Sequence, residues 1–262
     1  MLAFSQPPLG EPAHPDATYA FTALMAVAFV AMVGWSLWVA RRERTWVPIA
    51  CLLGGVIAFG YEPVLDSVAH IFYPLGSPLT FVTLFDTTIP VFVLLAWVFW
   101  AGAGTFLMSR YYDREPAGRD VLKWFLVICV LEAAFEYPAV LSEALIYYGD
   151  QPLKIAGFPW YWTFANTAPV FFAGYVLHLA KPHLRGVGGF AFTAMLPPFA
   201  YLGIGGGASW PIWLTLNGEV PIAIVWIAGL ITIALSVVLV ALLSRAVDRR
   251  YVLTVRTEEV TA

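Results

Sequence analysis

The sequence is poor in charged residues and in cysteine. Charged residues make up 12% of its 262 positions and hydrophobic residues make up 60%, whereas a soluble domain carries about 25% charged residues. Its mean hydropathy is +0.77. This composition excludes an ordinary soluble domain, and we expect residues 1–262 to form a single integral-membrane domain.

Several chemistries lack the residues that they need. Cys51 and Cys129 both lie in apolar stretches, so neither a disulfide framework nor a cysteine-based metal site is expected. The last apolar stretch, from Val220 to Ser244, has no lysine that could form a retinal Schiff base. The sequence shows no nucleotide-binding, haem or Ser-His-Asp motif. We therefore expect no metal, no cofactor and no nucleic-acid partner.

Long apolar runs are what the sequence has in abundance. A window of about 20 residues predicts an all-α membrane fold with seven transmembrane helices. The sixth is the weakest, because glycines between Gly203 and Gly207 interrupt it. The predicted spans are residues 18–40, 47–72, 87–109, 121–148, 160–180, 188–208 and 220–244.

Basic residues cluster between alternate spans. Of the 14 Lys and Arg residues, all but Lys154 fall on the side that holds the C-terminus. Because basic loops stay in the cytoplasm, we expect the N-terminus outside and the C-terminus inside a prokaryotic cytoplasmic membrane. The Pro-rich residues 1–17 are interpreted as an outer tail, without the features of a signal peptide, and residues 246–262 as a cytoplasmic tail.

Ionisable side chains occur inside two of the spans, in the half nearer the outer side. A charged group in hydrocarbon costs roughly 2.5–3.5 kcal/mol on insertion scales. At 100° per residue, each set falls within an arc of about 80° or less, so each helix is expected to present one acidic stripe. The second span carries one set and the fourth the other: Glu62, Asp66 and His70, then Glu132, Glu136 and Glu143.

These acids have a functional and a structural interpretation. Burial beside a second carboxyl favours the protonated form, which can act as a general acid. Glu62, Asp66 and Glu136 are therefore the catalytic candidates. The structural alternative is a polar cluster that holds helices together by hydrogen bonds. No Lys or Arg lies at this depth in the sequence, so Tyr, Asn and Trp are the expected partners.

Polar and aromatic residues near the same depth are candidates for substrate binding. Asp86 and Asn166 precede prolines at the outer ends of the third and fifth spans, where they either cap helices or contact a substrate. The stretch FPWYWTF is denser in aromatic residues than a membrane-interface belt needs, and aromatic faces stabilise cations. The substrate-binding candidates are His70, Asp86, Glu132, Glu143, Trp160, Trp162 and Asn166.

The second and fourth spans resemble each other. Aligning Pro63 in YEPVLDSVAHIFYPLG with Pro138 in EYPAVLSEALIYYGDQ also aligns Tyr73 with Tyr148, at an offset of 75. FDTTIPVF and FANTAPVF, at the starts of the next spans, match at an offset of 79. We interpret spans two-three and four-five as a duplicated helical hairpin, with spans six-seven as a candidate third copy. A repeat interface is a common place for a membrane site.

The stretches YEPVLDSVAHIFYP and FEYPAVLSEALIYYGDQPLKIAGFPWYWTFANTAP resemble the AveC-like (avermectin spirocyclase-like) integral-membrane family. The resemblance covers spans two to five and rests on scattered acidic, Tyr and Gly-Phe-Pro-Trp positions. The architecture is also similar to that of small membrane-bound terpene cyclases, which use intramembrane acids to protonate an epoxide or olefin. Both resemblances imply acid-catalysed ring formation on an apolar substrate that enters from the lipid.

We therefore expect a membrane enzyme that catalyses cyclisation, isomerisation or hydration of a terpenoid- or polyketide-type substrate. Glu62 or Glu136 would donate the proton, and Asp66 would support that group by hydrogen bonding. Two alternatives stay open. A proton-coupled transporter would also use intramembrane acids, and a protein that binds lipids or isoprenoids would use the same pocket without chemistry.

Overall fold

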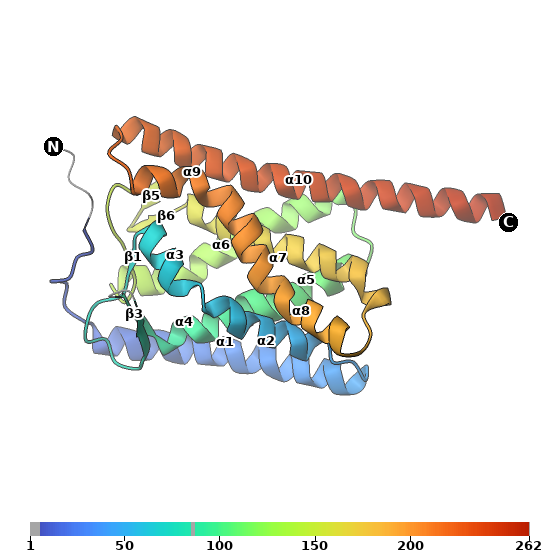
Figure 1. Cartoon of the computed structure of the whole chain (residues 1–262), viewed down its shortest axis with the longest axis horizontal. Helices are drawn as coiled ribbons and strands as arrows, with labels where there is room; N and C mark the ends of the chain where they lie inside the picture. Colours follow the sequence, from blue (N-terminus) through green and yellow to red (C-terminus); the bar gives the residue numbers. More distant parts are fainter. Residues whose placement is uncertain (1–5, 85–86, 262) are drawn as a thin grey trace.

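The chain folds into a helical bundle with short strands at one end (Figure 1). The computed structural model describes residues 6–84 and 87–261, with side chains described up to residue 248. The α-helices in this part of the chain are α1 (Pro15–Arg42), α2 (Val47–Phe59), α3 (Glu62–Ala69), α4 (Val91–Trp97), α5 (Gly104–Tyr112), α6 (Gly118–Leu141), α7 (Tyr161–Ala180), α8 (Gly186–Ala200), α9 (Gly206–Leu216) and α10 (Ile222–Thr261). Shorter helical segments are the π-helices η1 (Val98–Ala103) and η3 (Tyr201–Gly205) and the 3₁₀-helix η2 (Lys181–His183).

The helices confirm a membrane protein of the all-α class. Five of them, within the described residues, are long and apolar enough to cross a membrane, and a sixth span results if α2 and α3 are taken together. α4, η1 and α5 form one such span, and α8, η3 and α9 form another. α7 is helical where the fifth span was expected but is not among these spans.

Three of the expected spans extend too far, and the sixth, expected over residues 188–208, is too short, because the helix continues through η3 and α9 to Leu216. The second span is not one straight helix, because it bends by 50° between α2 and α3, where Pro63 occupies the first turn of α3. Residues Thr87–Pro90 form strand β3, so the third helix begins only at Val91. The fourth helix ends at Leu141, well before residue 148. Hydropathy marks apolar residues whether they lie in a helix or a strand, so it overextended all three.

The strands gather at one end of the bundle, which we call the strand end (Figure 1). β2 and β3 form a hairpin before α4, and β5 and β6 form one before α7. β1, which follows α3, pairs antiparallel with β4, which follows α6. This pairing ties together the ends of the two acid-bearing helices. The strands are β1 (Ile71–Phe72), β2 (Thr80–Leu84), β3 (Thr87–Pro90), β4 (Ile146–Tyr147), β5 (Lys154–Ile155) and β6 (Phe158–Pro159).

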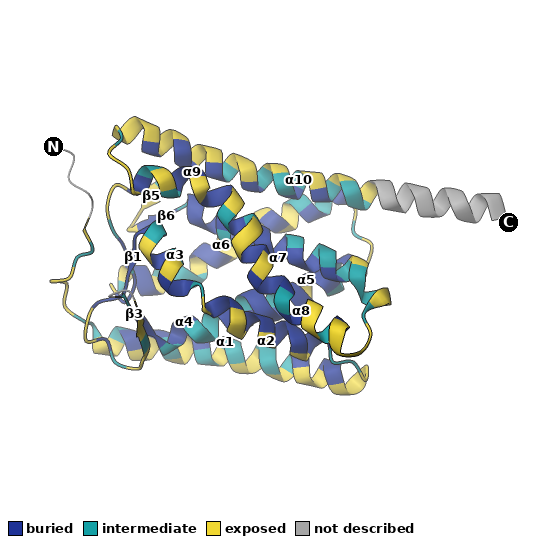
Figure 2. Cartoon of the chain, viewed as in Figure 1, coloured by how far each residue is buried: buried dark blue, intermediate teal, exposed yellow. Residues whose placement is uncertain are grey.

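The outward faces of α1 and α10 are largely exposed (Figure 2), and many of the exposed residues there are large and apolar. Val27 on α1 is 70% exposed and Leu242 on α10 is 55% exposed. Soluble monomers rarely expose apolar surface on this scale, whereas lipid chains would cover it at no cost. The outer surface therefore agrees with the apolar spans in indicating a membrane protein.

Two glycines bring α2 and η1 into backbone contact. A Cβ atom on Gly55 would lie 2.8 Å from the carbonyl oxygen of Trp97, and one on Gly102 would lie 2.8 Å from that of Cys51. Real Cβ atoms do not approach so closely, so each position admits only glycine without a shift of the backbone. The contact fixes where the Trp97 backbone lies relative to α2, and so relative to α3, which follows α2.

Gly55→Ala is expected to lower the free energy of unfolding by about 1–3 kcal/mol, because the added methyl group forces α2 and η1 apart. The matched control is Gly34→Ala on α1, where a Cβ atom meets nothing within 4 Å and where alanine has the better helix propensity by about 1 kcal/mol. Thermal unfolding in detergent compares the two. A Gly55→Ala protein as stable as the Gly34→Ala protein would contradict the close contact.

Candidate functional site

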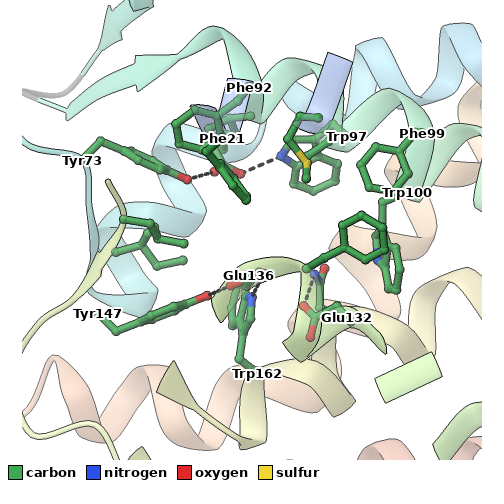
Figure 3. A pocket seen from close by; sticks show the side chains of 18 of the residues that line it. Phe21, Tyr73, Phe92, Trp97, Phe99, Trp100, Glu132, Glu136, Tyr147 and Trp162 are labelled. Carbon is green, nitrogen blue, oxygen red and sulfur yellow. Dashed lines mark hydrogen bonds between the residues drawn. The ribbon is translucent and has the colours of Figure 1, made fainter. Parts of the chain in front are cut away.

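A cavity of about 110 Å³ lies inside the bundle near the strand end (Figure 3). We call it the acid cavity. Its lining is dominated by aromatic rings from α1, α4, η1, α6, α7 and η3, and it includes the side chains of Glu62, Glu132 and Glu136. No Lys, Arg or His side chain lines it in the described part of the chain. The acid cavity is thus apolar in its walls and acidic in its polar groups.

Glu62 is held on one wall by two hydrogen bonds. The Tyr73 hydroxyl donates to its Oε1 at 2.7 Å, and the Trp97 indole N–H donates to its Oε2 at 2.7 Å. The glutamate is 7% exposed. The first turn of α3 supplies the carboxyl, the segment after β1 supplies the tyrosine, and α4 supplies the tryptophan.

Glu136 is held on the facing wall in the same way (Figure 3). The Tyr147 hydroxyl donates to its Oε2 at 2.5 Å, and the Trp162 indole N–H donates to its Oε1 at 3.2 Å. α6, β4 and α7 supply these three groups. We call each set of one glutamate, one tyrosine and one tryptophan a clamp.

Both clamps favour the ionised form of their glutamate. An indole N–H can only donate, and a phenol with its usual pKa near 10 stays protonated at neutral pH. Within the described residues, neither Tyr73 nor Tyr147 has a second acceptor for its hydroxyl hydrogen. A protonated Glu62 or Glu136 would compete with that hydrogen, whereas a carboxylate accepts both donors. Charge-assisted hydrogen bonds of this kind are the stronger ones.

The two clamps are related by an offset of 74 residues. Glu62 and Tyr73 are 11 residues apart, as are Glu136 and Tyr147. In the β1–β4 ladder Phe72 pairs with Ile146, and 146 minus 72 is again 74. This pair therefore maps onto itself under the offset, as it would if a local two-fold axis passed through it; the other pair, Ile71 with Tyr147, differs by 76. A left-handed residue also follows each acid-bearing helix: His70 follows α3 and Glu143 follows α6, both at φ 57°. These two residues are 73 positions apart and so do not share the offset of 74.

The offset of 75 inferred from the prolines is wrong by one residue. Tyr147, not Tyr148, takes the place of Tyr73, and Tyr148 instead stacks on the His70 ring with 4.6 Å between ring centroids. The match between FDTTIPVF and FANTAPVF fails as well. Thr87–Pro90 is a strand, whereas the corresponding residues 166–169 lie inside α7.

Each clamped glutamate has a second acid one helical turn away. The two second acids differ in their access to the acid cavity and in their hydrogen-bond partners. Glu132 lines the acid cavity, is 3% exposed, and accepts a hydrogen bond from Asn166 at 2.8 Å through Oε1. Its Oε2 is buried without a partner of good geometry among the described residues. Asp66 is fully buried beside Glu62 but lies outside the lining, and both its oxygens lack such a partner.

Asn166 was a candidate helix cap, and that structural alternative is wrong. α7 begins at Tyr161 with Trp160 at its N-cap position, so Asn166 lies in the second turn. Its side chain contacts Glu132 inside the acid cavity. The amide therefore positions one of the acids instead of ending the helix.

The other expected binding residues lie outside the acid cavity. The His70 ring faces Asn217 at 3.3 Å, and burial lowers the pKa of this histidine while the Asn217 contact opposes the shift. Glu143 is on the surface, 3.2 Å from His14. Trp160 donates to the Tyr137 hydroxyl. Asp86 lies outside the described residues. Of the expected binding set, the cavity brings together Glu132, Trp162 and Asn166.

Sequence reasoning missed three members of the clamps: Tyr73, Tyr147 and Trp97. The repeated spacing of Glu, ten residues and Tyr was present in the sequence, but the alignment on prolines concealed it. The tryptophans follow no common spacing, since Trp97 is 35 residues from Glu62 and Trp162 is 26 residues from Glu136. Only the folded structure shows that both tryptophans donate a hydrogen bond to a glutamate of the acid cavity.

The described residues offer the acids neither a cluster of metal ligands nor a lysine partner. The described residues contain no group of three or more His, Cys, Asp or Glu side chains suited to a metal ion. Lys154, in β5, donates to the backbone carbonyl of Tyr147, and burial lowers the pKa of its ammonium group. The lining of the acid cavity therefore offers no cationic side chain to pair with a clamped carboxylate.

No family model, no curated protein and no solved structure matches the chain. The resemblance to the AveC-like family stays a prediction. What the molecule does is inferred from the geometry of the acid cavity.

Tyr147→Phe is expected to lower the free energy of unfolding by about 1.5–3 kcal/mol, the usual worth of a hydrogen bond to a charged group. Tyr148→Phe is the matched control, because it keeps the ring on His70 and removes a hydroxyl outside the clamp. Thermal unfolding of both variants in one detergent measures the difference. Equal losses from the two substitutions would contradict the offset of 74 and the second clamp.

Proposed function

We propose that the chain is a membrane-embedded acid/base enzyme that cyclises, isomerises or hydrates an apolar terpenoid- or polyketide-type substrate through a cationic intermediate. The observation that carries this proposal is the pair of clamped glutamates facing each other across an aromatic cavity. Fixed carboxylates stabilise positive charge as it develops, and aromatic faces do the same. The resemblance to the AveC-like family supports the same class of reaction.

The size of the cavity restricts what enters it. At about 110 Å³ it is smaller than the roughly 150 Å³ cavity that accommodates benzene. Only the reacting end of a terpenoid fits inside. The lining residues Ala96, Trp100 and Phe135, on α4, η1 and α6, are partly exposed. The apolar remainder of the substrate would extend past them toward the lipid.

Glu132 is the proton donor in this proposal. Its carboxyl receives one hydrogen bond, from Asn166, and none from a tyrosine or tryptophan, so Glu132 holds a proton more readily than the clamped Glu62 and Glu136 do. The O–H bond of Glu132 breaks as the proton bonds to an olefinic carbon or epoxide oxygen of the substrate. This assignment replaces Glu62 or Glu136, the donors expected from the sequence, because the hydrogen bonds favour those two as carboxylates.

The cation is then quenched by an internal nucleophile or by water, and the proton released at that step passes to Glu136. Glu136 interacts with Glu132 one turn away on α6, so the proton can return there and close the cycle. Glu62 stabilises the cation from the opposite wall. No net proton is consumed.

The transporter alternative has less support. A proton relay would continue through the bundle, yet in the described spans no Asp or Glu lies between Glu132 and residues at the other end such as Asp113 and Asp120. Binding without catalysis would use the same acid cavity, and conversion of a fed precursor separates it from the proposed enzyme.

We also propose that the chain crosses the membrane seven times, with the strand end on the outer side of the membrane. α7 would complete the bundle as the seventh span, and two of the side chains that lower its hydropathy, those of Trp162 and Asn166, line the acid cavity. The basic loops at the opposite end favour that end as the cytoplasmic one.

A cell that expresses the chain and is fed linear terpenoid and polyketide precursors is expected to produce a new isomer or hydrate, detected by mass spectrometry of lipid extracts. Glu132→Gln is expected to reduce the yield by about 10²–10⁴-fold, the usual worth of a general acid, and Glu62→Gln and Glu136→Gln also reduce it. Glu143→Gln, on the surface, is the control. Turnover that survives Glu62→Gln combined with Glu136→Gln would sink the proposal.

Orientation is tested by cysteine labelling in intact cells with a membrane-impermeant maleimide. The native Cys51 and Cys129 are buried and are expected to stay unlabelled. Asp150→Cys at the strand end should react, and Arg114→Cys at the opposite end should react only after the membrane is permeabilised. The reverse pattern would overturn the proposed topology.

A further inference from the structure

In the ionised form that the clamps favour, the glutamates leave a net negative charge in the acid cavity, and its lining does not balance that charge. Glu62 and Glu136 face each other as carboxylates, and the lining supplies no cationic side chain. Burying an uncompensated charge costs several kcal/mol. The hydrogen bonds of the clamps reduce that cost, but they leave the net negative charge inside the cavity.

The walls are suited to a cation whose charged atom carries apolar groups. Trp97 and Trp162 hold their glutamates from opposite sides, and the rings of Phe92 and Tyr201 complete the enclosure. An aromatic face attracts a cation by about 2 kcal/mol or more when the site is dry. Inorganic cations need several oxygen ligands around them, and this lining is too aromatic to provide them.

Glu132 adds a second, independent pointer to a ligand. Its buried Oε2 has no hydrogen-bond partner of good geometry among the described residues, although the residue lines the cavity and its carboxyl lies near that of Glu136. A basic nitrogen arriving as the free amine from the lipid would take the Glu132 proton: the O–H bond breaks, an N–H bond forms, and the new N–H donates to Oε2. The result is an ammonium–carboxylate pair between the two clamps.

We infer that the acid cavity is a binding site for lipophilic tertiary amines, whose ammonium head lies between Glu62 and Glu136 and whose apolar tail extends toward the lipid. A dimethylammonium head has the few heavy atoms that about 110 Å³ can hold. The inference rests on the charge states argued for the proposed function, but it requires no turnover.

The test uses the full chain in lipid nanodiscs with N,N-dimethyldodecylamine as the probe. The amine is expected to raise the unfolding temperature in a saturable way, because a ligand that binds only the folded state stabilises it. Two comparison ligands separate charge from apolarity: the carbon isostere with CH in place of nitrogen, and dodecanoate. Neither should stabilise the protein.

Variants locate the site. Glu62→Gln combined with Glu136→Gln is expected to weaken amine binding at least tenfold, whereas Glu143→Gln, which removes a surface carboxylate in the same lipid, should bind as the wild type does. Equal stabilisation by the amine and its isostere, or unchanged binding in the double variant, would overturn the inference. If the double variant does not fold, the comparison of amine with isostere on the wild type alone decides the matter.

The outcome is separable from that of the proposed function. Amine binding without conversion of any fed precursor would keep the site and reject the enzyme. Conversion that needs Glu132, with no selective amine binding, would keep the enzyme and reject the site.

Discussion

The glutamate–tyrosine–tryptophan clamp is the interaction on which the rest of the structure depends. A charged carboxylate inside a membrane span costs roughly 2.5–3.5 kcal/mol on insertion scales, and a hydrogen bond to a charged group returns about 1.5–3 kcal/mol. Two donors for each of Glu62 and Glu136 are thus of the size needed to hold them there. The donors come from outside the acid-bearing helix, so each clamp also ties three segments of the chain together.

This requirement explains the strand end. The tyrosine of each clamp sits 11 residues after its glutamate, and a continuing helix would carry it about 16 Å further along the axis. Ending α3 and α6 through a left-handed residue and turning each chain into a short strand brings the tyrosine back to its glutamate. The β1–β4 ladder then places the two tyrosines, and so the two clamps, on facing walls.

The two clamps match each other, but the acids beside them differ. Glu132 lies one turn before Glu136 and lines the cavity, whereas Asp66 lies one turn after Glu62 and is sealed away from it. A symmetric pair of acids would give two equivalent walls. The observed pair gives one wall whose second acid reaches the cavity and one whose second acid does not, so only Glu132 can exchange a proton with a bound substrate directly.

The sequence was a good guide to the helices and to the depth of the acids, because apolar runs and charge are local properties. It predicted that Glu62, Glu132 and Glu136 lie in the outer half of one bundle, and these three line one cavity. It could not predict the partners. Trp97 reaches Glu62 only because the chain bends between α2 and α3 and because Gly55 lets η1 approach α2 closely. The sequence placed His70 and Glu143 on acidic stripes because it extended two helices that in fact end before these residues.

The central claim is that Glu62 and Glu136 are carboxylates at neutral pH and that Glu132 carries the proton. Infrared difference spectroscopy of the purified protein tests it, since protonated and ionised carboxyl groups absorb at separate frequencies. Subtracting the Glu62→Gln or the Glu136→Gln spectrum from that of the wild type should reveal a lost carboxylate band. Subtracting the Glu132→Gln spectrum should reveal a lost band of a protonated carboxyl. Loss of a protonated band on replacing Glu62 and Glu136, with loss of a carboxylate band on replacing Glu132, would contradict the account.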